Sequence, residues 1–321
     1  MIREIPLKID SSGLNTTGNV LVTGARGFLG RHVARLFSRK GNTVLGIGHG
    51  EWLREEWESW GLSGWQRADV TLGTLEQNAG TPSTIVHCAG GGSVAFSIDD
   101  PVADFERTVQ TTAHLLEYVR TVAPSCRVVY PSSVSVYGAV EDLPIREDCH
   151  KAPISQYGVH KLMAEQMIAS YARQFGTSAA IVRLFSVYGC GLRKQLLWDA
   201  CRKIANHDSV FMGTGEEVRD WLHVEDAAEL LLVAADRASA ECPTVNGGTG
   251  EGITVREMLI HLAGSLQQRG LMPTFSGMRR TGDPSRYIAD IKRSKEWGWS
   301  PKRHWKEGVA EYAAWWTRNS L

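Results

Sequence analysis

Residues 20–30 read Val20-Leu21-Val22-Thr23-Gly24-Ala25-Arg26-Gly27-Phe28-Leu29-Gly30. A short apolar run leads into three spaced glycines, and a helical pattern follows. The spacing suits a tight turn at Gly24, a close approach of a ligand to the backbone at Gly27, and close packing of a helix at Gly30. The stretch therefore predicts a buried strand, a turn and a helix in direct succession, which is how a parallel sheet begins.

The same alternation continues to about residue 185. We expect strands at 19–23, 43–47, 84–88, 127–131 and 179–184, and helices at 28–39, 101–122 and 155–175. Near-continuous apolar strands indicate a sheet that is covered on both faces, so we predict an α/β fold with a doubly wound parallel Rossmann sheet. Later residues mix short helices, at 224–235 and 255–269, with glycine-containing loops, which predicts a smaller C-terminal lobe.

The 321 residues are enough for about two domains of typical size. We expect a polar N-terminal extension at 1–17, a Rossmann domain at 18–185 with a return segment around 218–245, and a lobe formed by 186–217 and 246–321.

Composition excludes several kinds of partner. Lys and Arg number 35 and so do Asp and Glu, so no net positive charge attracts a nucleic acid or an anionic membrane. No apolar run is long enough to span a bilayer, and the N-terminus does not look like a secretory signal, so we expect a cytoplasmic protein. The six cysteines lack metal-ligand spacing, which predicts reduced thiols and no metal site.

The glycine turn predicts a dinucleotide site. Unpaired N–H groups at the start of the helix point at a bound diphosphate. We expect the turn to contact the cofactor through Gly24, Arg26, Gly27, Phe28, Leu29 and Gly30.

The end of the second strand decides which dinucleotide is favoured, because a carboxylate there binds the adenosine ribose and repels a 2′-phosphate. The stretch Gly48-His49-Gly50 has no carboxylate, and Arg26 and His49 can meet a 2′-phosphate. NADP is therefore favoured over NAD. The alternative is that Arg26 is merely solvated and Glu51 reaches the ribose.

Asp69 and Val70 follow the third-strand region at 65–68 and are expected on the adenine side of the cofactor. Asp69 is placed to accept a hydrogen bond from the adenine amino group. A helix cap is the alternative role for Asp69.

Tyr157 and Lys161 lie four residues apart in an expected helix and so share a face. An ammonium and a hydrogen-bonding hydroxyl nearby favour the phenolate of a tyrosine, which makes it an acid/base near neutral pH. Ser133, after the strand at 127–131, can supply that hydroxyl. We expect Tyr157 to carry the proton of a substrate hydroxyl, Ser133 to polarise the substrate oxygen, and Lys161 also to hydrogen-bond the nicotinamide ribose.

With these residues the chain resembles an extended short-chain dehydrogenase/reductase of the nucleotide-sugar epimerase/dehydratase/reductase family over roughly residues 19–310. The matching pieces are Thr23 to Gly30, His87-Cys88-Ala89-Gly90, Ser132 to Gly138, Tyr157 to Lys161, Arg183 to Gly189, Arg219 to Val224 and Arg280 to Pro284. The resemblance implies cofactor contacts at Cys88, Ala89 and Gly90. It also implies a homodimer through the helices at 101–122 and 155–175.

The same resemblance implies that the lobe binds a nucleoside-diphosphate sugar. Arg219 and Arg280 match positions that hold the phosphates, and guanidinium groups suit that task. Ser93 matches the sugar-facing loop. Ser186 stands where the family often has Asn, and Thr108 replaces another common Asn.

The resemblance also bears on the type of reaction. The family's 4,6-dehydratases carry an Asp-Glu pair where this chain has Val134-Ser135, so dehydration is not expected. The first hypothesis is an NADPH-dependent reductase of a nucleotide-activated 4-keto-hexose, with Tyr157 as general acid. The second is a nucleotide-sugar 4-epimerase with tightly bound NAD, and the third is a non-catalytic dinucleotide sensor.

Overall fold

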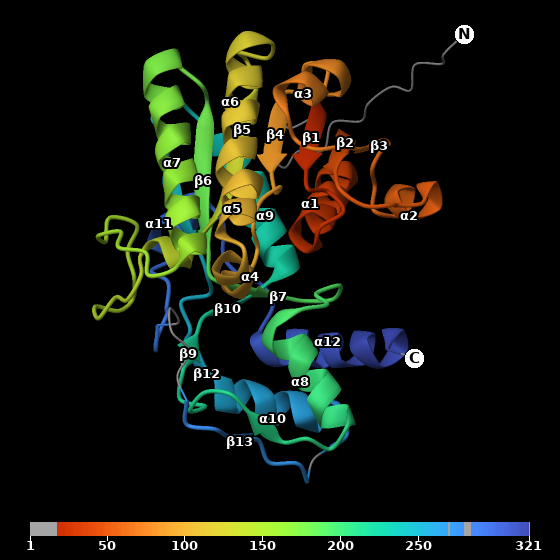
Figure 1. The fold of residues 1–321 in the computed structure, drawn as a ribbon, viewed down its shortest axis with the longest axis vertical. Coiled ribbons are helices and arrows are strands. Elements are labelled where there is room, and N and C mark those ends of the chain that lie inside the picture. The colour runs from red at the N-terminus through yellow and green to blue at the C-terminus, as the bar shows by residue number, and fades with distance from the viewer. Residues whose placement is uncertain (1–17, 269, 279–283, 321) are drawn as a thin grey trace.

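A seven-stranded parallel sheet forms the centre of the molecule in the computed structural model, which describes residues 18–268, 270–278 and 284–320 (Figure 1). The strand order is β11-β6-β5-β4-β1-β2-β3. The strands are β1 (Asn19–Thr23), β2 (Thr43–Gly48), β3 (Gly64–Arg67), β4 (Thr84–His87), β5 (Arg127–Ser133), β6 (Ala179–Leu184) and β11 (Thr244–Gly247).

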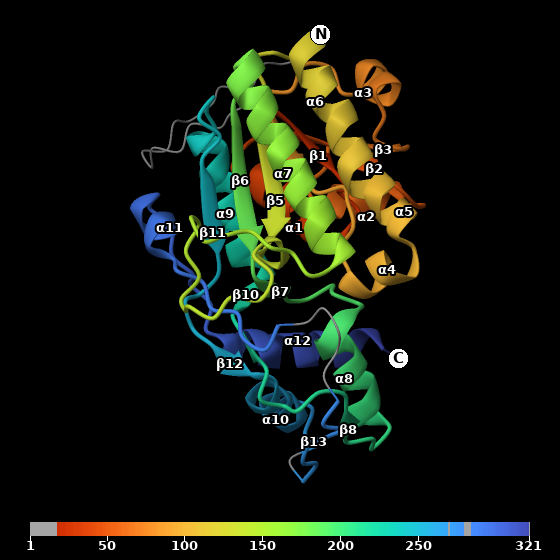
Figure 2. The same ribbon diagram turned by 60° about the vertical axis from the view of Figure 1, so that its left-hand side comes forward.

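Helices cover both faces of this sheet. The helices of the described residues are α1 (Phe28–Arg39), α2 (Arg54–Ser59), α3 (Leu72–Asn78), α4 (Val94–Asp99), α5 (Pro101–Phe105), α6 (Thr111–Thr121), α7 (Gln156–Phe175), α8 (Gln195–Ala205), α9 (Val224–Arg237), α10 (Val255–Ser265), α11 (Lys292–Glu296) and α12 (Trp305–Asn319). Helices α1 and α9 share one hydrophobic core with the sheet, and α3, α6 and α7 share the core on the other face. Figure 2 shows α6 and α7 side by side in front of the strands. The central strands are buried because both layers cover them, as their apolar sequences predict.

The carboxyl ends of the strands face a smaller C-terminal part, which contains α8, α10 and α12 and lies below the sheet in Figure 1. Three short pairs of strands are found there: β7 (Ser186–Tyr188) with β10 (Trp221–His223), β9 (Val218–Arg219) with β12 (Ile253–Thr254), and β8 (Val210–Phe211) with β13 (Thr274–Phe275). Helices α8, α10 and α12 enclose a separate hydrophobic core in this part. A ligand at the carboxyl edge of the sheet therefore meets both parts, as is general for open α/β sheets.

Local capping places the start of α7. Ser155 is its N-cap, and the Ser155 side chain accepts a hydrogen bond from the Gly158 N–H. The buried hydroxyl of Ser97 accepts the N–H of Tyr157 at 3.0 Å. The helix ends at Gly176, whose φ of 71° suits a residue without a Cβ. These contacts fix Tyr157 in the first turn of α7, beside the end of β5.

The expected doubly wound parallel sheet is confirmed, and each of the five expected strands is found within two residues of its expected ends. The expected helix at 101–122 is interrupted by a π-helical turn at Glu106–Gln110. The helix expected at 255–269 ends at Ser265, and Gln267 has a φ of 62°, which an α-helix cannot accommodate.

Among the residues that the structure describes, no helix is long and apolar enough to cross a bilayer. The same residues hold no group of three side chains arranged to bind a metal. All six cysteines are free thiols.

Candidate active site

The glycine turn forms a narrow cradle between β1 and α1. Gly24 has a φ of 65°, and its N–H donates to the Ile47 carbonyl at 2.7 Å. A Cβ on Gly24 would lie 2.8 Å from the Ala89 nitrogen, and a Cβ on Gly30 would overlap the Gly24 carbonyl oxygen. Gly27 is the N-cap of α1 and has no side chain to cover the free N–H groups there. Backbone that a Cβ would obstruct, at the positive end of a helix, fits the diphosphate of a dinucleotide.

The other expected contacts of the turn differ in their surroundings. Phe28 and Leu29 begin α1 and are half-buried, and each packs against a different core. Across the turn, the Ala89 N–H donates to the Thr23 hydroxyl at 3.1 Å, and Gly90 has a φ of 148°. Half-buried Cys88 lies between them and the end of β4. The two loops that follow β1 and β4 therefore lie side by side, as a cofactor bridging them requires.

The residues expected on the adenosine side gather at the ends of β2 and β3. The guanidinium of Arg26 lies against Gly50, where a Cβ would meet its Nη1 at 2.5 Å. His49 Nε2 is 3.2 Å from Asp69 Oδ1, and both side chains are exposed. Thr71, rather than Asp69, caps α3, so the alternative reading of Asp69 as a helix cap is wrong. Val70 is buried in the core that contains α3.

Glu51, the alternative ribose ligand, is engaged elsewhere. Its carboxylate contacts Arg67 at the end of β3, and both side chains are exposed. An exposed ion pair is weak, so a ligand can compete for either residue.

Ser133, Tyr157 and Lys161 come together at the carboxyl end of β5. Ser133 is the last residue of that strand, and its hydroxyl is near enough to the Tyr157 phenol to lower the pKa of Tyr157. Lys161 is 5% exposed, its Nζ donates to the Pro131 carbonyl at 3.1 Å, and it lies 5.9 Å from the centre of the Tyr157 ring. The three expected catalytic side chains therefore share one site.

The protonation states differ from the expectation. Burial raises the pKa of Tyr157 to about 12, and its hydrogen bond with Ser133 only partly opposes this. Burial likewise lowers the pKa of Lys161 to about 8. Burial of the phenol therefore opposes the expected acidification of Tyr157 in the protein by itself, and the Ser133 hydroxyl offsets it only in part. At neutral pH the site holds a phenol and an ammonium.

A buried ion pair supports α7 from behind. Arg183 on β6 donates to both carboxylate oxygens of Glu165, and the Ser132 hydroxyl donates to Glu165 at 2.5 Å. Arg183 also donates to the Tyr137 hydroxyl at 2.9 Å. Glu165 lies one turn after Lys161, so this network holds the catalytic face of α7 against β5 and β6.

The expected substrate residues that the structure describes lie on three different elements, α4, β7 and β9. Ser93 is the N-cap of α4, and its hydroxyl accepts the Phe96 N–H at 3.3 Å. Ser186 begins β7 and is half-buried. The Arg219 guanidinium donates to the carbonyls of Val218 and Ser285 and lies 5.7 Å from the centre of the Tyr287 ring. Arg280 lies outside the described residues.

Asp220 is a structural residue of the adjoining loops. Its buried carboxylate accepts hydrogen bonds from the N–H groups of Thr249, Gly250 and Ala289 and from the Thr249 hydroxyl. Burial raises the pKa of Asp220 although these bonds oppose the shift. The carboxylate thus joins three chain segments below the sheet.

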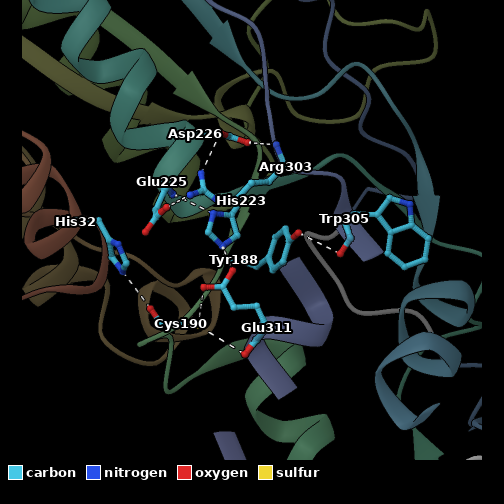
Figure 3. Close-up of polar contacts among 9 residues, drawn as sticks. All are labelled: His32, Tyr188, Cys190, His223, Glu225, Asp226, Arg303, Trp305 and Glu311. Atoms are coloured by element: carbon cyan, nitrogen blue, oxygen red, sulfur yellow. Dashed lines mark hydrogen bonds and ion pairs between the residues drawn. The ribbon is translucent and has the colours of Figure 1, made fainter. Parts of the chain in front are cut away.

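A second polar cluster, shown in Figure 3, joins α1 to α12. His32 on α1 is 3.0 Å from the Cys190 carbonyl, and the Cys190 sulfur is 3.8 Å from Glu311 on α12. His223, which caps α9, is 3.8 Å from Glu311. Burial lowers the pKa values of both histidines to about 4, so they are neutral at pH 7. The cluster therefore links α12 of the C-terminal part to α1, the helix that follows the glycine turn.

Three buried residues near the site, Asp104, His160 and Glu165, were not expected from the sequence. His160 precedes Lys161, and its Nδ1 is 2.7 Å from Asp104 Oδ2. Their separation of 56 positions leaves no local pattern that could reveal the pair. Glu165 could have been found, because it follows Lys161 by four positions on the same helix face.

Comparison with known proteins gives concordant results. The model of a family described as "NAD dependent epimerase/dehydratase family" matches residues 20–246. The UDP-glucose 4-epimerase of Azospirillum brasilense is 28% identical, over 94% of this chain and 92% of its own. The structure of a UDP-glucose 4-epimerase from Thermotoga maritima with UDP-glucose has 25% identity and a TM-score of 0.83, and covers 94% of this chain and 100% of its own. MoeE5 in complex with UDP-glucose and NAD has 29% identity and a TM-score of 0.81, and covers 95% and 100%.

Proposed function

Because the chain belongs to the NAD-dependent epimerase/dehydratase family, we propose that it is a 4-epimerase of a nucleoside-diphosphate hexose that works with NAD. The observation that carries this proposal is the meeting of Tyr157, Ser133 and Lys161 at the carboxyl end of β5, next to the glycine cradle. Full-length relatives that are named UDP-glucose 4-epimerase support the choice of reaction. They favour the second sequence hypothesis over the first, a reductase.

The side chains have distinct tasks in this reaction. NAD, when bound, would supply a reversible hydride acceptor for C4 and a positive charge on its nicotinamide ring. Positive charge beside Tyr157 favours the phenolate, which takes the proton of the C4 hydroxyl and later gives it back. Ser133 hydrogen-bonds the same oxygen. Lys161 holds the cofactor ribose and keeps a cation below Tyr157.

The sugar nucleotide lies between the sheet and the C-terminal part. Arg219 binds the diphosphate, since a guanidinium matches phosphate geometry. Arg280 is proposed for the same task on the sequence alone. Ser93 and Ser186 face the sugar, Ser93 from the start of α4, which it caps. Cys88, Ala89 and Gly90 face the nicotinamide.

Product analysis tests this function directly. We expect the purified protein to convert UDP-glucose into UDP-galactose without added NADPH, as seen by NMR of the anomeric protons. A matched reaction supplies NADPH and a 4-keto-6-deoxy nucleotide sugar. Oxidation of NADPH there, with no epimer in the first reaction, would establish the reductase instead.

The position of Arg26 favours a second candidate, an NADPH-dependent 4-keto-sugar reductase. Its guanidinium lies at Gly50, and β2 ends without a carboxylate. A 2′-phosphate placed there would accept charge-assisted hydrogen bonds from Arg26. His49 adds a second donor, and Asp69 is on the same side for the adenine.

Exchange of Arg26 tests the cofactor preference. If Arg26 holds a 2′-phosphate, Arg26→Gln should weaken NADP⁺ binding by about tenfold, the loss of one strong charged contact, and NAD⁺ binding by less than about twofold. Calorimetric titration of both cofactors measures this. Arg39→Gln, at the exposed far end of α1, is the control. Equal losses for the two cofactors would remove the basis for NADP and leave NAD.

A homodimer and a cytoplasmic location belong to the same proposal. Phe105, Val122 and Phe175 are large apolar side chains exposed on or beside α5, α6 and α7. A second copy that packs against these helices would cover them. Sedimentation of the purified chain distinguishes monomer from dimer.

A further inference from the structure

Asp104 is a buried carboxylate that the proposed mechanism does not use. It lies on α5 and is 0% exposed. Its Oδ2 is 2.7 Å from His160 Nδ1, within both hydrogen-bond and ion-pair distance. Its other oxygen, Oδ1, has no hydrogen-bond partner in the described structure. That oxygen lies against the loop after β4, because a Cβ on Gly91 would overlap it. A buried, half-satisfied carboxylate is costly and calls for a functional explanation.

The surroundings of Asp104 connect it to the catalytic side chains. His160 lies between Tyr157 and Lys161 in sequence, and its ring packs edge-on against Phe105 at 5.6 Å. The Gly91 N–H donates to the Thr108 hydroxyl at 2.8 Å, and Thr108 lies in the π-helical turn that follows α5. π-helical turns occur frequently at functional sites. Asp104 thus joins α5, α7 and the loop of Gly90 and Gly91. Lys161 lies against the same loop, because a Cβ on Gly90 would lie 3.7 Å from its Nζ.

The charge of Asp104 is less compensated than that of Glu165, the buried carboxylate one turn after Lys161 on α7. Arg183 neutralises Glu165 by three hydrogen bonds. Among the described residues, only His160 lies within ion-pair distance of Asp104. Buried charges act over longer distances than exposed ones because water does not screen them.

We propose that Asp104 is a positioning residue for this reaction: held by His160, its carboxylate keeps Lys161 an ammonium and Tyr157 a phenol in the resting site. This inference rests on the proposed roles of Tyr157 and Lys161. The charge of Asp104 raises the pKa of Lys161 against the dominant effect of burial, and it adds to the effect of burial on Tyr157. The titratable groups that share this space are His87 and Cys88 at the end of β4, Tyr130 on β5, and Tyr157, His160, Lys161 and Glu165 on α7.

The decisive comparison removes the charge while keeping the shape. Asp104→Asn should lower the pH at which kcat falls on the basic side by about one pH unit, the effect of removing one nearby unit charge at an effective dielectric constant of about 20. KM should change by less than about twofold. His160→Gln, which keeps the Asp104 carboxylate, should leave the pH at which kcat falls on the basic side unchanged. Asp99→Asn, on exposed α4, is the matched control for loss of an acid.

A second readout does not need turnover. NAD⁺ is titrated calorimetrically between pH 6 and pH 9 into each variant, since Lys161 holds the cofactor only as an ammonium. The loss of affinity with rising pH should begin at lower pH in Asp104→Asn. If the wild type forms no epimer but Asp104→Asn still loses NAD⁺ affinity at a lower pH than the wild type, the proposed epimerase activity fails. The effect of Asp104 on Lys161 then stands.

Identical pH profiles for wild type and Asp104→Asn in both readouts would overturn the proposal. If Asp104→Asn does not fold, the neutral double variant Asp104→Asn/His160→Gln replaces it, with the same shift expected. Failure of both to fold, with His160→Gln folded, would assign Asp104 a structural role only and would also overturn it.

Discussion

Replacement of Tyr157 by Phe should lower kcat by roughly 10²–10⁴-fold, the range expected for loss of a general acid/base. Only the phenolic oxygen is removed, and the ring keeps its place in the first turn of α7, which Ser155 and Ser97 fix through the backbone. Binding of NAD⁺ should change by less than about twofold. Initial rates of UDP-galactose formation, together with calorimetric titration of NAD⁺, measure both effects.

A control on the same helix separates chemistry from packing. Tyr171→Phe removes the hydroxyl that donates to Glu117 at 3.4 Å on the other end of α7. It should keep full activity. Full activity in Tyr157→Phe itself would contradict both the epimerase and the reductase.

Replacement of Lys161 by Met should lower kcat/KM by roughly 10²–10³-fold, because one change removes both the ribose donor and the cation near Tyr157. The side chain is 5% exposed, and Met fills a similar volume without a charge. NAD⁺ binding should weaken as well, which distinguishes this variant from Tyr157→Phe. Lys151→Met, in the loop before α7, is the control.

The pH dependence of the wild type follows from the same residue. Burial lowers the pKa of Lys161 to about 8, so the side chain is an ammonium below that pH and neutral above it. Activity should therefore decline as the pH rises through about 8. The decline should be absent from the residual activity of Lys161→Met. A wild-type rate that stays constant to pH 9.5 would show that this ammonium is not needed.

Features encoded by neighbouring residues could be predicted from the sequence. The strand at 19–23 and the glycine turn form one continuous stretch, so their pattern is local and the expected strand, turn and helix are found. Tyr157 and Lys161 share a helix face for the same reason. Helix α2 has six residues and no buried one, so its sequence carries no helical period to detect. Strand β11 has four residues, and its place is set by pairing with β6, far away in the chain.

Properties that depend on burial could not be predicted from spacing. The sequence places a cation near Tyr157, but only the fold reveals that desolvation raises the pKa of the phenol to about 12. The pair of Asp104 and His160 likewise exists only because α5 packs against α7. The residue types at the site were therefore predictable, and their protonation states were not.

The central claim is that a hydride leaves C4 of the sugar and returns to the same carbon. UDP-glucose carrying deuterium at C4 is incubated with the protein and no added NADPH, and the product is analysed by NMR and mass spectrometry. The predicted result is UDP-galactose that retains deuterium at C4. Epimer with hydrogen at C4, or no epimer while a 4-keto sugar is reduced by NADPH, would contradict the claim.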